Sequence, residues 1–172
     1  MADNYLLFSE CLEKLTPFEV NWLESVLEEM PDEDGDDCPQ FLLDYADRDE
    51  GDNYTGFDWL IEEDNKDRHG EEAPGYQRLH YMLIYSEDHG DPERVALLVQ
   101  KFLKACRPND WWSMSFAQTC SKPRVGEFGG GAVFITADEI RWFYTSELIS
   151  EAHKAFERIQ ALNVSRETHT NE

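Results

Sequence analysis

Negative charge is concentrated in one segment of this chain, and that segment limits how the chain can fold. Residues 28–93 contain 23 Asp and Glu against 4 Lys and Arg, a net charge of −19. Residues 1–27 carry −4 and residues 94–172 carry +1, so the segment holds most of the whole-chain charge of −22. Because unpaired carboxylates are costly to bury, the chain must fold with these acids facing solvent.

The composition is that of a folded protein. Hydrophobic residues make up 41% of the 172 and aromatic residues 13%, more than a disordered acidic segment would contain. We predict one domain over residues 1–162, with an acidic, loop-rich region at 28–93 and a polar tail at 163–172. The sequence has no secretion signal and no stretch of about 20 apolar residues, so a cytoplasmic protein without a membrane span is expected.

Three segments have the pattern of helices, and a fourth, residues 5–15, is expected to form a shorter helix. The first opens on a capping box at Thr16 and runs to Met30. The second follows an N-cap at Asp91, and Thr145 or Ser146 is expected to cap the third. The apolar stripe of the third helix consists of Ile149, Ala152, Phe156, Ile159 and Leu162.

Alternation of apolar and polar residues predicts the strands, which are residues 57–62, 112–117, 132–136 and 140–144. Residues 79–85 are apolar on both faces, which predicts a strand inside the sheet. Residues 40–45 fit either a short strand or a helical turn. Since short turns join several of these segments, antiparallel pairing is favoured. The predicted fold class is α+β, a single mainly antiparallel sheet with helices packed on it.

No metal site, cofactor site or catalytic motif is predicted. Neither Gly35 nor Gly51 fits position 6 of an EF-hand loop, because position 1 would then be Met30 or Ala46 and not an acidic ligand. Weak cation binding at a site without the EF-hand pattern remains an alternative. The four cysteines are widely spaced and are expected to be free thiols. Cys120 lies near Lys122 and Arg124, but no histidine stands in a context that marks it as the base of a nucleophilic cysteine.

The acidic segment is dense enough to imitate a nucleic acid. A compact chain of this length is about 40 Å across, so 19 net charges correspond to roughly one charge per 2 Å, against about 1.7 Å for B-DNA. The alternative is an acidic surface that serves solubility alone. The candidate partner-binding residues are Asp32, Glu33, Asp34, Asp36, Asp37, Asp47, Asp49, Glu50, Asp52, Asp64 and Asp67.

The segment over residues 120–131 is basic and rich in glycine. Its candidate anion-binding residues are Lys122, Arg124, Gly129, Gly130 and Gly131, since glycine backbone N–H groups can form an anion nest. A connection between two strands explains the glycines equally well. The order C-S-K-P-R followed by F-G-G-G-A-V resembles a stretch in uncharacterised bacterial and phage proteins, and this resemblance implies no activity.

The sequence therefore favours a non-enzymatic protein that binds a basic surface of another protein. A sharper hypothesis is a phage-type inhibitor, of the anti-restriction or anti-CRISPR class, that mimics nucleic-acid charge. Direct binding of nucleic acid or of a membrane is not expected, because both are anionic. The alternative from another class is a small enzyme or an anion-binding protein that uses the loop over residues 120–131.

Overall fold

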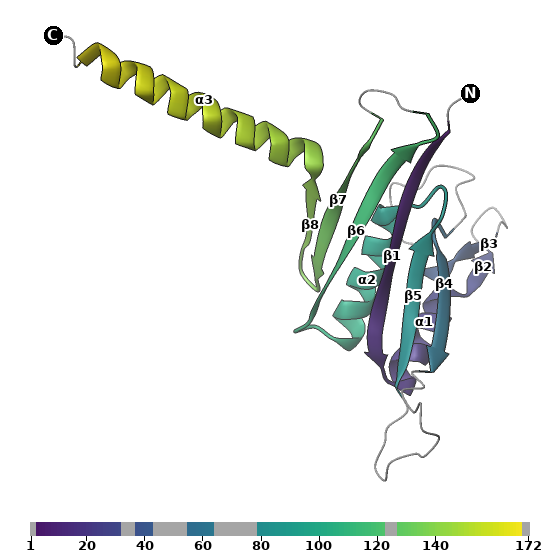
Figure 1. The fold of residues 1–172 in the computed structure, drawn as a ribbon. Helices are drawn as coiled ribbons and strands as arrows, with labels where there is room; N and C mark the ends of the chain where they lie inside the picture. The colour runs from purple at the N-terminus through teal and green to yellow at the C-terminus, as the bar shows by residue number, and fades with distance from the viewer. Residues whose placement is uncertain (1–2, 32–36, 43–54, 64–78, 123–126, 170–172) are drawn as a thin grey trace, which may run out of the picture.

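The computed structural model describes residues 3–31, 37–42, 55–63, 79–122 and 127–169. They form a six-stranded antiparallel sheet in the order β4-β5-β1-β6-β7-β8, which confirms the predicted α+β fold (Figure 1). The sheet strands are β1 (Asn4–Leu15), β4 (Asp58–Glu63), β5 (His80–Ser86), β6 (Trp111–Cys120), β7 (Gly129–Thr136) and β8 (Ile140–Tyr144). A separate two-stranded ribbon consists of β2 (Glu29–Pro31) and β3 (Asp37–Pro39).

Strand β1 lies at the centre of the sheet and joins its two halves. Residues 4–7 pair with β6, whereas the rest of the strand pairs with β5 from Phe8 onward. Beyond Leu7 the ladder with β6 ends, and the indole Nε1 of Trp112 donates a 3.0 Å hydrogen bond to the carbonyl of Cys11. The two strands diverge along this stretch (Figure 1).

The prediction of a helix over residues 5–15 is wrong. Phe8, Leu12 and Leu15 are all buried, and their spacing of four and then three residues fits one face of a helix. In β1 a register shift between Leu12 and Leu15 allows all three side chains to be buried on the same face of the strand, and Lys14 within this shift has φ 56°. The irregularity turns Leu15 to the core although it stands an odd number of residues after Leu12.

Helices α1 (Pro17–Leu27) and α2 (Pro92–Cys106) begin as predicted, at the Thr16 capping box and the Asp91 N-cap. Both lie on the same face of the sheet (Figure 1). Helix α1 ends earlier than predicted, because Met30 pairs with Cys38 in the β2–β3 ribbon instead of extending the helix. A short 3₁₀ helix, η1 (Gln40–Leu42), buries Phe41 and Leu42 beside them.

The core lies between this helical layer and the sheet. Helix α2 contributes Val95, Leu98, Val99 and Phe102, which are fully buried, and the sheet contributes Met82, Ile84, Met114, Val133 and Ile135. In each strand the buried residues alternate with residues on the opposite face. The strands predicted at 57–62, 79–85, 112–117 and 140–144 are confirmed, and β5 is an interior strand between β4 and β1.

The last helix, α3 (Thr145–His169), extends away from the sheet (Figure 1). It begins at Thr145, one of the two residues predicted to cap it, and Thr145 Oγ1 donates a 2.9 Å hydrogen bond to the carbonyl of Gly130. Three of its apolar side chains are exposed in the described part of the helix, with exposed fractions of 57% for Leu148, 65% for Ile149 and 57% for Phe156. The helix continues through residues 163–169, which were predicted to belong to a polar tail.

Candidate interaction surface

The sheet order separates the charged half of the sequence from the neutral half. Strands β4 and β5 belong to the segment of net charge −19 and form one side of the sheet. Strands β6, β7 and β8 belong to the neutral residues 94–172 and form the other side, with β1 between the two groups. The β2–β3 ribbon lies beside β4 in Figure 1, on the same side as the acidic strands. Among the described strands, β4 carries Asp58, Glu62 and Glu63 and no Lys or Arg, whereas β6 and β7 carry no charged residue. The described sheet therefore has an acidic side at β4 and β5 and a nearly neutral side at β6 and β7.

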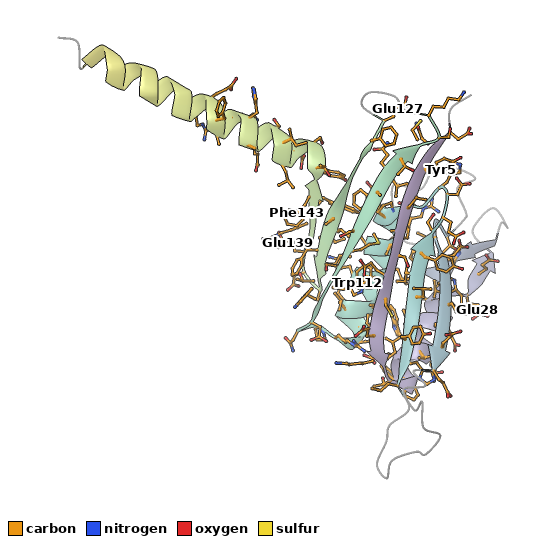
Figure 2. All side chains as sticks on the ribbon, in the orientation of Figure 1. Tyr5, Glu28, Trp112, Glu127, Glu139 and Phe143 are labelled. Atoms are coloured by element: carbon orange, nitrogen blue, oxygen red, sulfur yellow. The ribbon has the colours of Figure 1, made fainter. Side chains whose placement is uncertain are left out.

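One face of the sheet is not covered by any helix in the part of the chain that the structure describes (Figure 1). Strand pairing and alternation place apolar and aromatic side chains on this open face, among them Leu60, Trp111 and Phe143, which are 46%, 63% and 44% exposed. Trp111 stacks on Phe134 with ring centroids 5.4 Å apart. Figure 2 shows Phe143 on the outermost strand, β8.

A shallow hollow of about 630 Å³ lies on this face between β1 and β5. It is lined by Leu7, Phe8, Ser9, Leu83, Tyr85, Ser86 and Glu87. The lining is mainly apolar, with a carboxylate at its end. The hollow is open to solvent and does not form an enclosed cavity.

A second hollow, of about 360 Å³, is acidic and lies before the N-terminus of α2. Asp58, Glu87 and Asp88 contribute carboxylates to it, and His89 stacks on Tyr5 at 6.3 Å. The neighbouring Asp91 accepts hydrogen bonds from the backbone N–H groups of the first helical turn. Negative charge is stabilised at a helix N-terminus, which accounts for Asp91 as the N-cap of α2. Glu87 and Asp88, which precede it, are exposed to solvent.

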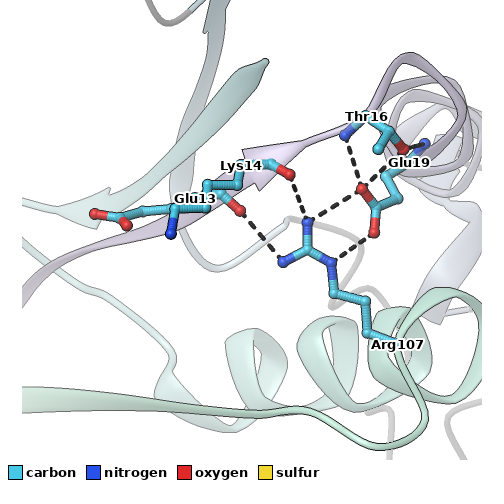
Figure 3. Close-up of polar contacts among 5 residues, drawn as sticks. All are labelled: Glu13, Lys14, Thr16, Glu19 and Arg107. Carbon is cyan, nitrogen blue, oxygen red and sulfur yellow. Dashed lines mark hydrogen bonds and ion pairs between the residues drawn. The ribbon is translucent and has the colours of Figure 1, made fainter. Parts of the chain in front are cut away.

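The two ends of the helical layer are tied together by an ion pair between Glu19 and Arg107 (Figure 3). Arg107 also donates to the backbone carbonyls of Glu13 and Lys14, at 3.2 and 2.9 Å, which fixes the end of β1. Burial raises the pKa of Glu19, but hydrogen bonds from Arg107 and Thr16 outweigh it and hold the pKa below its ordinary value. The hydrogen bond to Glu19 raises the pKa of Arg107. These contacts therefore join the start of α1, the end of α2 and the end of β1.

Most of the predicted partner-binding acids lie outside the described residues. This holds for Asp32, Glu33, Asp34, Asp36, Asp47, Asp49, Glu50, Asp52, Asp64 and Asp67. Asp37 is described and pairs with Pro31 in the β2–β3 ribbon. The structure adds Asp58, Glu87 and Asp88, which were not predicted because Asp58 lies within a predicted strand and the other two closely follow one.

The structure places the predicted anion-binding glycines in a strand and not in a loop. Gly129, Gly130 and Gly131 begin β7 and pair with Gln118, Ala117 and Phe116 of β6. Gly130 has φ +150°, and a Cβ on it would lie 2.3 Å from the carbonyl oxygen of Phe116. The close approach of the strands thus accounts for this glycine. Lys122 is exposed, and Arg124 lies outside the described residues, so anion binding there stays a prediction.

The thiol of Cys120 is buried and donates a 3.0 Å hydrogen bond to Oε2 of Glu127. Figure 2 shows Glu127 near the end of the sheet that holds the chain's N-terminus. Among the described residues no group of three or more His, Cys, Asp or Glu side chains could hold a metal ion. None of the described helices is long and apolar enough to cross a membrane.

Fold and surface together define a class: an antiparallel α+β domain with two helices on one face of the sheet and an acidic side. Comparison with protein-family models, curated proteins and solved structures gives no match for this chain.

Proposed function

We propose that this protein is a non-enzymatic interaction protein that binds a basic surface of another protein through its acidic side. The observation that carries the proposal is the sheet order, which gathers β4 and β5 of the −19 segment on one side and the neutral strands on the other. An even distribution of charge would serve solubility equally well. A one-sided distribution attracts a basic partner from one direction and orients it on approach.

The open face supplies the short-range part of the contact. Leu60 lies on β4 between Asp58 and Glu62, so apolar and acidic side chains alternate along the acidic edge. Exposed apolar groups rimmed by charges are typical of protein interfaces. The partner therefore combines a cluster of Lys or Arg with apolar side chains that fit between β1 and β5.

Nucleic-acid mimicry is the specific form of this proposal. A protein that binds DNA or RNA has a basic surface whose positive charges match the phosphate spacing. The −19 segment has a similar density of negative charge and can neutralise such a surface. Occupation of that surface would inhibit the partner, as phage-type anti-restriction or anti-CRISPR inhibitors do. The support is the number of charges in the segment and the position of its two described sheet strands, β4 and β5, on one side of β1.

The test compares two variants with the same change in net charge. The first reverses Asp58, Glu62 and Glu87 to Lys on the acidic side; the second reverses Asp110, Asp138 and Glu139 to Lys, which are exposed on the neutral half. A partner captured at low salt should associate at least about tenfold more slowly with the first variant than with the second. Equal rates for the two variants would refute a contact through the acidic side.

A further inference from the structure

Strand β4 forms one edge of the sheet, and the hydrogen bonds of β1 identify which backbone groups of β4 point outward. Leu6 of β1 exchanges backbone hydrogen bonds with Asp88 and Gly90, which follow β5 in the sequence. The N–H and C=O groups of the even-numbered residues from Leu6 to Leu12 therefore face β5, since successive residues of a strand face opposite sides. The hydrogen-bonded pairs of this ladder are Phe8 with Ser86, Glu10 with Ile84 and Leu12 with Met82.

The same alternation continues from β5 to β4. Ile84 is hydrogen-bonded to β1, so the preceding residue, Leu83, directs its backbone groups to β4, where it pairs with Leu60. Trp59 and Ile61, the neighbours of Leu60, therefore direct their N–H and C=O groups away from β5. No strand of the described chain pairs with that side of β4 (Figure 1). Such an edge is a template for the addition of another strand.

The side chains of β4 indicate which kind of strand fits this edge. Asp58, Leu60 and Glu62 lie on the open face of the sheet, and all three are exposed. In an antiparallel addition the residues opposite them form the non-hydrogen-bonded pairs, whose Cα atoms are only about 4.5 Å apart. Opposite charges at such positions attract each other and like charges repel. The hydroxyl of Tyr81 donates a hydrogen bond to Oε2 of Glu62, which holds that carboxylate on the open face.

We propose that β4 accepts an extended basic segment of the partner protein as an additional antiparallel strand. This inference rests on the proposed function, because it states how the acidic side holds its basic partner. The segment carries Lys or Arg opposite Asp58 and Glu62 and an apolar residue opposite Leu60, so its pattern is basic–x–apolar–x–basic. The same two acids repel β4 of a second copy of this chain, so the edge favours a basic strand over self-association.

The test uses a labelled synthetic peptide that contains Lys-Thr-Val-Thr-Lys, whose binding to the full chain is measured by fluorescence anisotropy at low salt. The two threonines stand opposite Trp59 and Ile61, so their N–H groups point to β4, whereas the valine N–H points to solvent. The peptide N-methylated at both threonines should bind at least about tenfold more weakly than the peptide N-methylated at the valine. Equal affinities would overturn strand addition, as would a lack of binding by the unmodified peptide.

A pair of substitutions tests the same edge from the protein side. Trp59→Pro removes an outward N–H group, whereas Trp59→Ala removes the same side chain and keeps that group. The unmodified peptide should bind the proline variant at least about tenfold more weakly than the alanine variant, and equal binding would contradict the proposal. Circular dichroism and thermal unfolding check that both variants are folded. If the proline variant does not fold, the comparison of the methylated peptides decides.

Failure of this inference and failure of the proposed function give different results. If the two methylated peptides bind equally while reversal of Asp58, Glu62 and Glu87 to Lys still slows association of the captured partner, strand addition is wrong and the contact through the acidic side stands. If that charge reversal leaves association with the partner unchanged, the proposed function itself is refuted.

Discussion

The guanidinium of Arg107 and the carboxylate of Glu19 meet at 2.5 Å, although 88 residues separate them in the sequence. Glu19 is the third residue of α1 and completes its capping box, and Arg107 caps the C-terminus of α2. The same guanidinium holds two carbonyls at the end of β1. One buried carboxylate thus connects both helices that cover the sheet to its central strand.

Replacing Glu19 by Gln should lower the free energy of unfolding by about 2–3 kcal/mol. The substitution removes the charge that pairs with Arg107 and leaves that guanidinium, whose side chain is 23% exposed, with a weaker acceptor. Urea denaturation measures the difference. Glu24→Gln is the matched control, since Glu24 is exposed on the same helix, and it should change stability by less than about 0.5 kcal/mol. Equal effects of the two would mean that the ion pair contributes nothing.

The effect of Glu19→Gln should also depend on pH. The folded protein holds the pKa of Glu19 below its ordinary value of 4.5, so the ionised form is stabilised by folding. That contribution is complete above the ordinary value and is lost as pH falls through the folded pKa. The difference in unfolding free energy between the natural protein and Glu19→Gln should therefore be constant near neutral pH and shrink below about pH 4.5. A difference that grows on acidification would contradict the sign of this linkage.

The capping box at Thr16 shows what the sequence alone could predict. Its residues are neighbours along the chain, so the start of α1 follows from local chemistry. The tie to Arg107 could not be predicted, because it depends on where two helices end after packing. In the sequence, Arg107 is only one of three cations, with Lys101 and Lys104, near the C-terminus of α2.

Strand β1 shows where local pattern misleads. Phe8, Leu12 and Leu15 satisfy a helical spacing, and the alternation of a strand is interrupted by the irregularity at Lys14. The choice between helix and strand is made by β5 and β6, which pair with β1 from far along the chain. The negative charge of the candidate surface could be predicted, because the acidic residues can be counted in the sequence. The position of β4 and β5 together on one side of β1 depends on the strand order, which no local pattern contains.

The glycines at the start of β7 provide a prediction with an internal control. A Cβ on Gly130 would lie 2.3 Å from the carbonyl oxygen of Phe116, and its φ of +150° is unfavourable for other residues. Gly130→Ala should therefore lower the unfolding free energy by about 2 kcal/mol or more. At Gly129 the nearest atom to a new Cβ is 3.8 Å away, so Gly129→Ala should be almost neutral. Thermal unfolding of the two variants decides between them.

The last prediction concerns nucleic acid itself. With a net charge of −22, the protein would have to overcome repulsion to bind DNA or RNA, and it gains nothing from counterion release. We expect no shift of a bare oligonucleotide in a gel at about 0.1 M salt. We expect instead that the protein releases an oligonucleotide from its basic partner, and that raising the salt concentration weakens this competition. The variant with Asp58, Glu62 and Glu87 reversed to Lys should compete less well than the control with Asp110, Asp138 and Glu139 reversed. Tight binding of the bare oligonucleotide by the natural protein, lost on Lys122→Ala with Arg124→Ala, would instead make the 120–131 segment the functional one and refute the acidic-side proposal.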